Sequence, residues 1–474
     1  MKILLINPPA LNTLASEVPS IVGEERGHNP PLGIMYIASV LEKDPSNEVE
    51  ILDAQLDELN YAQLKEEIIL RNPDVVGMTV MTFTLIDCII TARMAKEANK
   101  KIKIIIGGIH PNIFQNETIN LPEIDYIVLG EGEVAIPKLI KSLDKGKSEL
   151  KKIKGIIFKY KGKIIHTGNP DLIKNLDEVP FPARHLTEYQ KYSSLLAKRS
   201  PVTTMITSRG CPFRCLFCDR PHLGKVFRAR SAKNVVDEME ECAKMGIKEF
   251  LIYDDTFTIN KQRVLDICDE IIKRDLNIGW DIRARVDTVD EEMLKKMHEA
   301  GCERIHYGVE AGNKEILQVL RKGITLEQAE RAFKITRKAK IDTLAYFMIG
   351  SPRETKETIL DTINFAKRLK PGFVHFSITT PFPATALYYL ALEEGIIKKD
   401  VWKEFAENPM SAAKTFRAPL WEENLKKEEL FELLTYAYKN FYKRPSYILK
   451  KLFKIRSFDE LKRKVRAGLK VFKL

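Results

Sequence analysis

Three cysteines close together in one loop constrain the possible folds of this chain more than any other feature. Cys211, Cys215 and Cys218 are spaced Cys-x3-Cys-x2-Cys, directly after the apolar, β-branched run 202–206. Three thiolates so near one another can face one compact centre that binds soft ligands, such as an iron–sulfur cluster or zinc. Zinc would require a fourth Cys or His at short range, typically in CxxC pairs, and no such pair follows. The spacing therefore favours a four-iron, four-sulfur (4Fe–4S) cluster with one open iron, over zinc and over three structural cysteines.

Strand and helix patterns alternate over the first 145 residues. The strand patterns are continuously apolar, which is typical of parallel strands that are buried on both faces. We therefore predict an α/β unit with a parallel sheet of the flavodoxin or Rossmann type and helices on both sides. The predicted strands are 2–6, 48–52, 74–80, 103–106 and 125–129, and the predicted helices are 32–43, 62–70, 85–98 and 134–143.

A second alternation begins at residue 201 and has a longer period. Six strand–helix units predict a partial (β/α)6 TIM barrel, in which chemistry lies in loops at the carboxyl ends of the strands. The three cysteines follow the first of these strands, which places them at that end. The predicted strands are 202–206, 249–253, 278–284, 304–309, 343–349 and 373–378, and the predicted helices are 232–244, 263–274, 291–299, 326–338 and 356–369.

The remaining segments connect and extend these two units. A connector is expected to contain a β-hairpin over 155–166, because a glycine turn separates two apolar runs. The C-terminal region is expected to be helical, with a basic amphipathic tail. The predicted domains are therefore 1–145, 146–200, 201–390 and 391–474.

The cysteine spacing, with Phe217 just before the last cysteine, resembles the cluster loop of the radical S-adenosylmethionine (radical SAM) superfamily. The resemblance implies a 4Fe–4S cluster whose open iron binds the amino and carboxylate groups of S-adenosylmethionine (SAM). One-electron reduction would cleave SAM to methionine and a 5′-deoxyadenosyl radical, which abstracts hydrogen from an unactivated carbon. An electron donor such as ferredoxin or flavodoxin is implied as well.

Strand ends of the predicted barrel carry the groups that a SAM site needs. Arg285 ends the third strand, where a guanidinium can pair with the SAM carboxylate through two hydrogen bonds. By resemblance to the superfamily, Asp255 is expected to accept hydrogen bonds from the SAM ammonium group, with Asp254 as the alternative, and Glu310 from the ribose hydroxyls. A helix cap explains each charged residue alone equally well, and the coincidence of five loops at one rim favours the site. The adenine-side loop of the superfamily is similar to the segment with Gly350 and Pro352.

The carboxyl ends of the N-terminal strands are rich in glycines, hydroxyls and amides, which suit a bound ligand. No GxGxxG follows the first strand, so a dinucleotide is not expected. Together with the cluster loop, these strand ends resemble the cobalamin (B12)-binding domain of one radical SAM branch. The Asp-x-His-x-x-Gly motif that supplies a histidine to cobalt is missing, so the resemblance implies cobalamin without an axial histidine; a domain that has lost the cofactor is the alternative. The expected cofactor contacts are Asn7, Gln55, Thr79, Thr82, Gly107, Gly108, His110, Gly130, Glu131 and Gly132.

The basic charge of the chain is concentrated in its tail. Residues 443–474 hold twelve Lys or Arg and two acids, so ten of the eleven net positive charges lie there. Phe and Leu residues separate from the basic residues on the predicted helix, which suits anionic lipid headgroups better than RNA, and no DNA partner is expected. A basic helix docked on its own barrel explains the pattern equally well. With no apolar run long enough to span a membrane and few cysteines, we expect a cytoplasmic protein with peripheral membrane contact through this tail.

The first functional hypothesis is a cobalamin-dependent methyltransferase that methylates an unactivated carbon of a small-molecule or lipid substrate, with an isoprenoid-like lipid suggested by the tail. The second is a cobalamin-dependent radical enzyme that closes or rearranges rings or couples carbon atoms. The third, of another class, is a non-catalytic redox- or cobalamin-responsive binding protein. Only the first two require SAM cleavage, so formation of 5′-deoxyadenosine separates them from the third.

Overall fold

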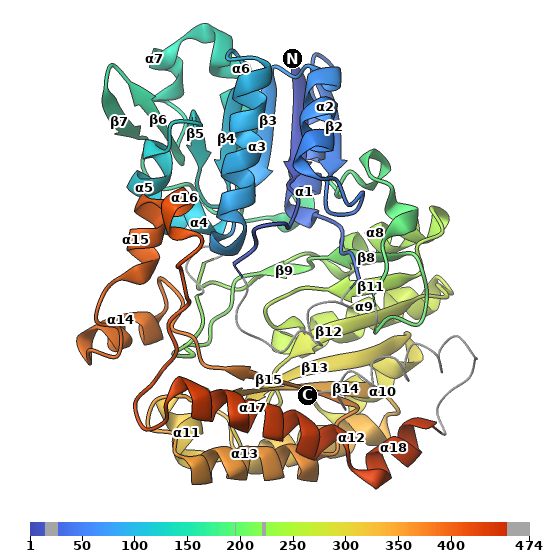
Figure 1. Cartoon of the computed structure of the whole chain (residues 1–474). Coiled ribbons are helices and arrows are strands. Elements are labelled where there is room, and N and C mark those ends of the chain that lie inside the picture. The colour runs from blue at the N-terminus through green and yellow to red at the C-terminus, as the bar shows by residue number, and fades with distance from the viewer. Residues whose placement is uncertain (15–26, 195, 220–223, 453–474) are drawn as a thin grey trace.

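Two sheets of mainly parallel strands, one above the other in Figure 1, organise the chain. The computed structural model describes residues 1–14, 27–194, 196–219 and 224–452. The blue and cyan N-terminal unit lies above the green and yellow barrel, and the orange and red C-terminal helices run beside both. The predicted α/β fold class, with two strand–helix units in this order, is confirmed.

The N-terminal sheet consists of β1 (Lys2–Asn7), β2 (Glu48–Asp53), β3 (Val75–Thr79), β4 (Lys103–Gly107), β5 (Tyr126–Val128), β6 (Ile156–Tyr160) and β7 (Lys163–His166). The strand order is β2-β1-β3-β4-β5-β6-β7. Neighbours among β1 to β5 are parallel, whereas β6 runs antiparallel to β5 and β7 antiparallel to β6. The hairpin of the connector therefore continues the N-terminal sheet.

Helices cover both faces of this sheet, as continuously apolar strands require. On one face, α1 (Leu32–Leu41) and α6 (Gly132–Ser142) pack against Ile3 and Leu5. On the other, α2 (Tyr61–Arg71) and α3 (Leu85–Ala98) pack against Leu4 and Ile6. The sequence patterns do not predict three short helices: α4 (Ile109–Ile113), α5 (Gln115–Asn120) and α7 (Lys147–Leu150).

The second sheet forms the wall of an open barrel with β8 (Val202–Met205), β11 (Glu249–Ile252), β12 (Gly279–Ala284), β13 (Cys302–Glu310), β14 (Asp342–Ile349) and β15 (Phe373–Ile378). All neighbours are parallel in the order β15-β14-β13-β12-β11-β8, which confirms the partial barrel. The helices that follow its strands are α8 (Ala232–Lys244), α9 (Lys261–Lys273), α10 (Glu291–Glu299), α11 (Lys314–Val319), α12 (Leu326–Lys338) and α13 (Lys356–Leu369).

Each barrel strand separates an apolar outer face from a polar inner face. On β12, Trp280 and Ile282 belong to the core beneath the helices, and the alternating residues Asp281 and Arg283 point to the opposite side. The same alternation recurs on β13, where Ile305 and Tyr307 belong to the core and Arg304 and His306 point to the opposite side. The inner face is therefore the side on which polar chemistry can take place.

Two tyrosines complete the open edge of the barrel sheet. Both lie on α17 (Lys427–Tyr442), which follows α14 (Ala386–Glu393), α15 (Val401–Glu407) and α16 (Pro409–Ala412). Tyr438 Oη donates to the carbonyl of Phe376 (2.9 Å) and accepts from its amide (3.1 Å). Tyr442 Oη makes the same pair of bonds with Val374, at 2.9 and 3.0 Å. The two hydroxyls thus satisfy edge groups of β15 that another strand would otherwise pair.

The C-terminal helices also join the two units. Phe405 of α15 enters the core beneath α3, and Figure 1 shows α15 and α16 beside α5. The chain then reaches α18 (Pro445–Leu452), and the rest of the predicted basic helix lies outside the described residues. Within the described ranges, no helix has the length and apolar character to cross a membrane.

Candidate cofactor site

The cluster loop lies at the carboxyl end of the barrel, between the antiparallel strands β9 (Ser208–Arg209) and β10 (Arg228–Ala229). Cys211 and Cys215 are half-buried, Cys218 is exposed, and all three are free thiols. Leu216 pins the middle of the loop, because its amide donates to Leu320 O and its carbonyl accepts from Leu387 N, both at 2.9 Å. The loop is thus fixed between the end of α11 and the start of α14.

Asp254 supports the segment that enters the cluster loop. It is 1% exposed and accepts hydrogen bonds from the amide and hydroxyl of Thr207 and from the hydroxyl of Ser208. The next residue, Asp255, is exposed, and its charge acts on the Cys218 thiol. This division of roles supports Asp255 over Asp254 as the partner of the SAM ammonium group.

Arg285 lies directly beside the cluster loop. Its Nη1 is 4.0 Å from Cys215 Sγ, and its guanidinium lies 3.8 Å from the centre of the Phe213 ring. Asp287 accepts from Nε and Nη2 of Arg285, both at 2.9 Å, which fixes the guanidinium plane. The predicted SAM carboxylate partner is therefore next to the cysteines, held by an acid that the sequence did not single out.

Glu310 ends β13 in a strained conformation close to the same loop. Its φ of 73° lies in the left-handed region, where the backbone of a non-glycine residue costs about 1–3 kcal/mol. The strand register shifts between Gly308 and Glu310. Its carboxylate pairs with Lys322 Nζ at 2.8 Å, and both side chains are buried. Lys322, which sequence reasoning missed, neutralises this carboxylate beside the cysteines.

The loop after β14 contains the other predicted SAM contacts. Gly350 also has a left-handed backbone, with φ of 71°. Ser351 N donates to the Glu354 carboxylate at 2.8 Å, and burial raises the pKa of Glu354 to about 8. Glu354 thus holds the loop that contains Pro352, while the next residue, Thr355, caps α13.

The three thiols can each bind one iron of a cluster. No three His, Cys, Asp or Glu side chains are grouped around one metal position in the part of the chain that the structure describes. A 4Fe–4S cluster does not need such a grouping, because it takes each thiolate at a different iron. Burial raises the pKa of the Cys215 thiol, and the charges of Lys322 and Arg285 act in the opposite direction. Cluster binding would therefore release protons from these thiols.

The N-terminal strand ends are joined by polar contacts at the edge where the parallel strands end. Asn7 Nδ2 donates to Asp53 at 2.7 Å, Gln55 Nε2 donates to Pro8 O at 2.9 Å, and Tyr192 Oη donates to Asp53 at 2.8 Å. This network ties the connector to the strand ends.

Glycines lie at the neighbouring strand ends, where no side chain projects from the backbone. Gly108 has φ of 102°, and a Cβ there would come within 2.7 Å of Val80 O. Gly107 and Gly130 are half-buried, and Thr79 is exposed beside Gly108. Gly132 begins α6 at the same edge. Without side chains, these glycines would allow a bound group to approach the backbone closely beside the exposed Thr79.

His110 is buried close to these strand ends. Its Nδ1 lies 3.1 Å from Thr82 Oγ1, and its Nε2 has no hydrogen-bond partner in the described ranges. Burial lowers the pKa of His110 to about 3, so the imidazole is neutral at physiological pH. The predicted cofactor contact His110 is therefore fully buried, and its role stays a prediction.

Buried ion pairs join the N-terminal unit to the cluster loop. Glu131 pairs with Arg209 at 3.0 Å and with Arg228 at 2.9 Å, and Glu133 also pairs with Arg209. All four side chains are at most 9% exposed. Arg209 directly precedes the loop segment that carries Cys211. We call these four residues the interdomain clamp. The carboxylate of Glu131, which was a predicted cofactor contact, is thus part of this clamp.

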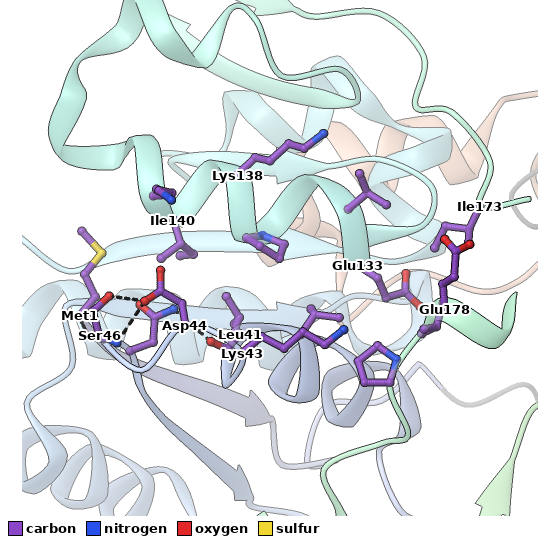
Figure 2. A pocket seen from close by; sticks show the side chains of 17 residues that line it. Met1, Leu41, Lys43, Asp44, Ser46, Glu133, Lys138, Ile140, Ile173 and Glu178 are labelled. Carbon is purple, nitrogen blue, oxygen red and sulfur yellow. Dashed lines mark hydrogen bonds between the residues drawn. The ribbon is translucent and has the colours of Figure 1, made fainter. Parts of the chain in front are cut away.

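A cavity of about 740 Å³ lies elsewhere, between α1 and α6. Figure 2 shows Lys43, Asp44 and Ser46 on one side of it and Lys138 of α6 on the other. No residue of the cluster loop lines this cavity. It is therefore separate from the candidate cofactor site.

Comparisons with known proteins agree with this site. The model of the radical SAM superfamily matches residues 205–366, and the model of the B12 binding domain matches residues 20–140. An uncharacterized methyltransferase of Pyrococcus horikoshii is 35% identical over 100% of this chain and 99% of its own length. The chain belongs to the radical SAM superfamily, in the branch with a B12-binding domain. The cofactors of this family are a 4Fe–4S cluster, SAM and cobalamin.

Other relatives match this chain over most of its length. Anaerobic magnesium-protoporphyrin IX monomethyl ester cyclase of Rubrivivax gelatinosus is 32% identical over 77% of this chain and 67% of its own. The solved methyltransferase TsrM of Kitasatospora setae, with cobalamin and cluster bound, has a TM-score of 0.68 and 22% identity, covering 83% of this chain and 78% of its own. The radical enzyme OxsB, with aqua-cobalamin and SAM bound, has a TM-score of 0.67 and 18% identity, covering 99% of this chain and 72% of its own. These two structures share the fold.

The interdomain clamp leads to a stability prediction. Arg209→Met leaves Glu133 buried without its cation, so we expect the apparent free energy of unfolding to fall by about 3–5 kcal/mol. The control Lys154→Met removes a pair with Asp171 in which the side chains are 64% and 80% exposed, and should change it by less than about 1 kcal/mol. Urea unfolding followed by fluorescence measures both, and equal midpoints for the two variants would contradict the clamp.

Proposed function

We propose that this radical SAM protein is a cobalamin-dependent methyltransferase that methylates an unactivated carbon. The observation that carries the proposal is the fixed contact between the cluster loop and the B12-binding unit through buried ion pairs. A methyl donor on one unit and a radical initiator on the other must meet at such a contact. The Pyrococcus relative, which matches over the whole chain, is described as a methyltransferase.

The residues of the barrel rim divide the work of holding the cluster and SAM. Cys211, Cys215 and Cys218 would hold three irons. Arg285 would bind the SAM carboxylate, and the two hydrogen bonds to Asp287 would keep its guanidinium group in one orientation. When bound, the cluster supplies one-electron cleavage of SAM, and methylcobalamin supplies a methyl group. The rim residues that would receive the rest of SAM are Asp255 for the ammonium, Glu310 for the ribose, and Gly350 and Pro352 on the adenine side.

A second candidate function is a cobalamin-dependent cyclase or ring-rearranging enzyme. It is favoured by the 32% identity to the Rubrivivax cyclase, which extends over 77% of this chain. Such an enzyme would use the same cluster and SAM residues and would transfer no methyl group to the product. The non-catalytic binding protein is the remaining candidate, and it would cleave no SAM.

One assay separates the three candidates. The full chain, reconstituted with cluster and cobalamin, is incubated with a strong reductant and SAM that carries a labelled methyl group. We expect 5′-deoxyadenosine to form and, with a suitable substrate, label to enter the product. Deoxyadenosine without label in a converted product supports the cyclase, and absence of deoxyadenosine contradicts both enzyme candidates.

The cluster assignment is tested by one cysteine and a matched control. Cys215→Ala should lose the thiolate-to-iron charge-transfer absorbance and SAM cleavage together, because only two thiolates remain. Cys242→Ala changes the same residue type within α8, where the side chain is 1% exposed, and should keep both. Iron analysis that finds four irons per chain in the Cys215 variant would contradict the assignment.

The proposed partners are an electron donor such as ferredoxin or flavodoxin, a small-molecule or lipid substrate, and an anionic membrane surface. Membrane contact through residues 443–474 rests on the basic and apolar faces that the sequence predicts for a helix in this segment. Tyr447 of α18 donates to Gly372 O at 3.0 Å, so a truncation should begin after residue 452. Removal of residues 453–474 should weaken binding to vesicles of anionic lipid and leave cluster content unchanged. Equal vesicle binding by the truncated protein would contradict membrane contact.

A further inference from the structure

The inner face of the barrel sheet carries ionisable side chains, whereas its outer face is apolar. Ile305 and Tyr307 of β13 belong to the core beneath the helices, and His306 between them faces the other side. The parallel register places Arg283 of β12 opposite His306, and Tyr346 of β14 opposite His375 of β15. These four side chains therefore share one surface inside the barrel.

Arg283 is the cation of this surface that has no carboxylate partner among the described residues. Its Nη1 donates to Ile252 O at 3.2 Å, and its guanidinium lies 3.8 Å from the centre of the Tyr253 ring. The neighbouring Arg304, by contrast, lies 3.6 Å from Asp281. Because Arg283 is half-buried, its charge is partly removed from water without being neutralised.

Further polar groups lie beside this cation. His306 Nδ1 is 3.0 Å from Tyr346 Oη, which links β13 to β14. His306 Nε2 lies 3.3 Å from Asp281 but makes no hydrogen bond in the described ranges, although the side chain is 8% exposed. The His375 ring lies 5.5 Å from that of Tyr346, and both residues are half-buried. Solvent therefore reaches Arg283, Tyr346 and His375, while His306 and Asp281 are buried behind them on the same face.

This surface lies close to the proposed SAM site. Arg285, which is beside Cys215, directly follows β12 and is two residues beyond Arg283, a step of about 7 Å in extended chain. A group bound at Arg283 would thus lie one step deeper in the barrel than SAM. A substrate must reach that region for a radical formed at SAM to attack it.

We propose that the inner face of β12 to β15 binds an anionic oxyacid group of the substrate, a carboxylate or a phosphate, with Arg283 as its charge partner and Tyr346 and His375 as further donors. The inference rests on the proposed function, because it names the substrate class of the same barrel. A guanidinium fork matches either oxyanion in geometry and charge. A purely hydrocarbon substrate would desolvate Arg283 further without supplying a charge partner, so a lipid substrate would have to present an anionic group here.

The test is the binding of inorganic phosphate and of acetate to the full chain with cluster and cobalamin, measured by calorimetry at constant ionic strength. We expect at least one of the two anions to bind, and Arg283→Gln to weaken that binding by about tenfold or more. Arg283→Lys, which keeps the charge and loses the fork, should weaken it less. Arg331→Gln removes the same charge from an exposed position on α12 and should leave the affinity unchanged. The more tightly bound anion identifies the group.

Equal affinities of the wild type and Arg283→Gln, or binding of neither anion to the wild type, would overturn the subsite. If Arg283→Gln does not fold, His375→Phe on β15 replaces it, and unchanged anion affinity in that variant is the contradicting result. Formation of 5′-deoxyadenosine is measured separately. Its absence would count against the proposed function and leave the anion measurement intact, whereas loss of the Arg283 dependence would count against the subsite alone.

Discussion

The ion pairs between Glu131, Glu133, Arg209 and Arg228 are the interaction on which the rest of the structure depends. Charges buried to this degree are tolerated only when they are paired, so the two units have one favoured way to meet. Arg209 leads directly into the cluster loop, and Glu131 and Glu133 begin the helix that follows β5. The same contact that joins the units therefore also places the cysteines opposite the strand ends of the B12-binding unit.

Within the barrel, side chains alternate between the two faces of each strand, so the residues that form the core and those that carry charge lie on opposite faces. Alternate residues of β12 and β13 pack under the helices and make the core, while the residues between them carry the charges. The chemistry is then concentrated where these strands end. Arg285 lies beside Cys215, and Glu310 adopts a strained backbone while it pairs with Lys322. Strain of this kind persists where the surroundings fix a residue for a function.

Local patterns in the sequence were sufficient to predict the strands of both sheets and their longer helices. The bounds of α8, α10, α12 and α13 agree with the prediction, because each helix is strongly amphipathic and begins after a side-chain cap such as Ser231 or Asp290. The helices α4 and α5 are too short to show a period, which explains why they were missed. The sheet pairing of the β6–β7 hairpin is not encoded within the hairpin itself.

Residues that follow strands or match a motif, namely the three cysteines, Arg285 and Glu310, could be proposed from the sequence, and the structure brings them together. Asp287 and Lys322 gain their roles from burial beside those residues, which no spacing reveals. The interdomain clamp is the clearest case, because Glu131 and Arg209 are 78 residues apart. Charged residues of this kind look like solvated surface until the fold brings them together.

The central claim is that one chain holds cobalamin on its N-terminal unit facing the cluster of its own barrel. Electron paramagnetic resonance of the full chain, loaded with both cofactors and partly reduced, tests it most directly. We expect one cobalamin and four irons per chain, with a dipolar interaction that broadens or splits the signals of cobalt and the reduced cluster. Two independent signals, or an intact cluster in a chain that binds no cobalamin, would contradict the claim.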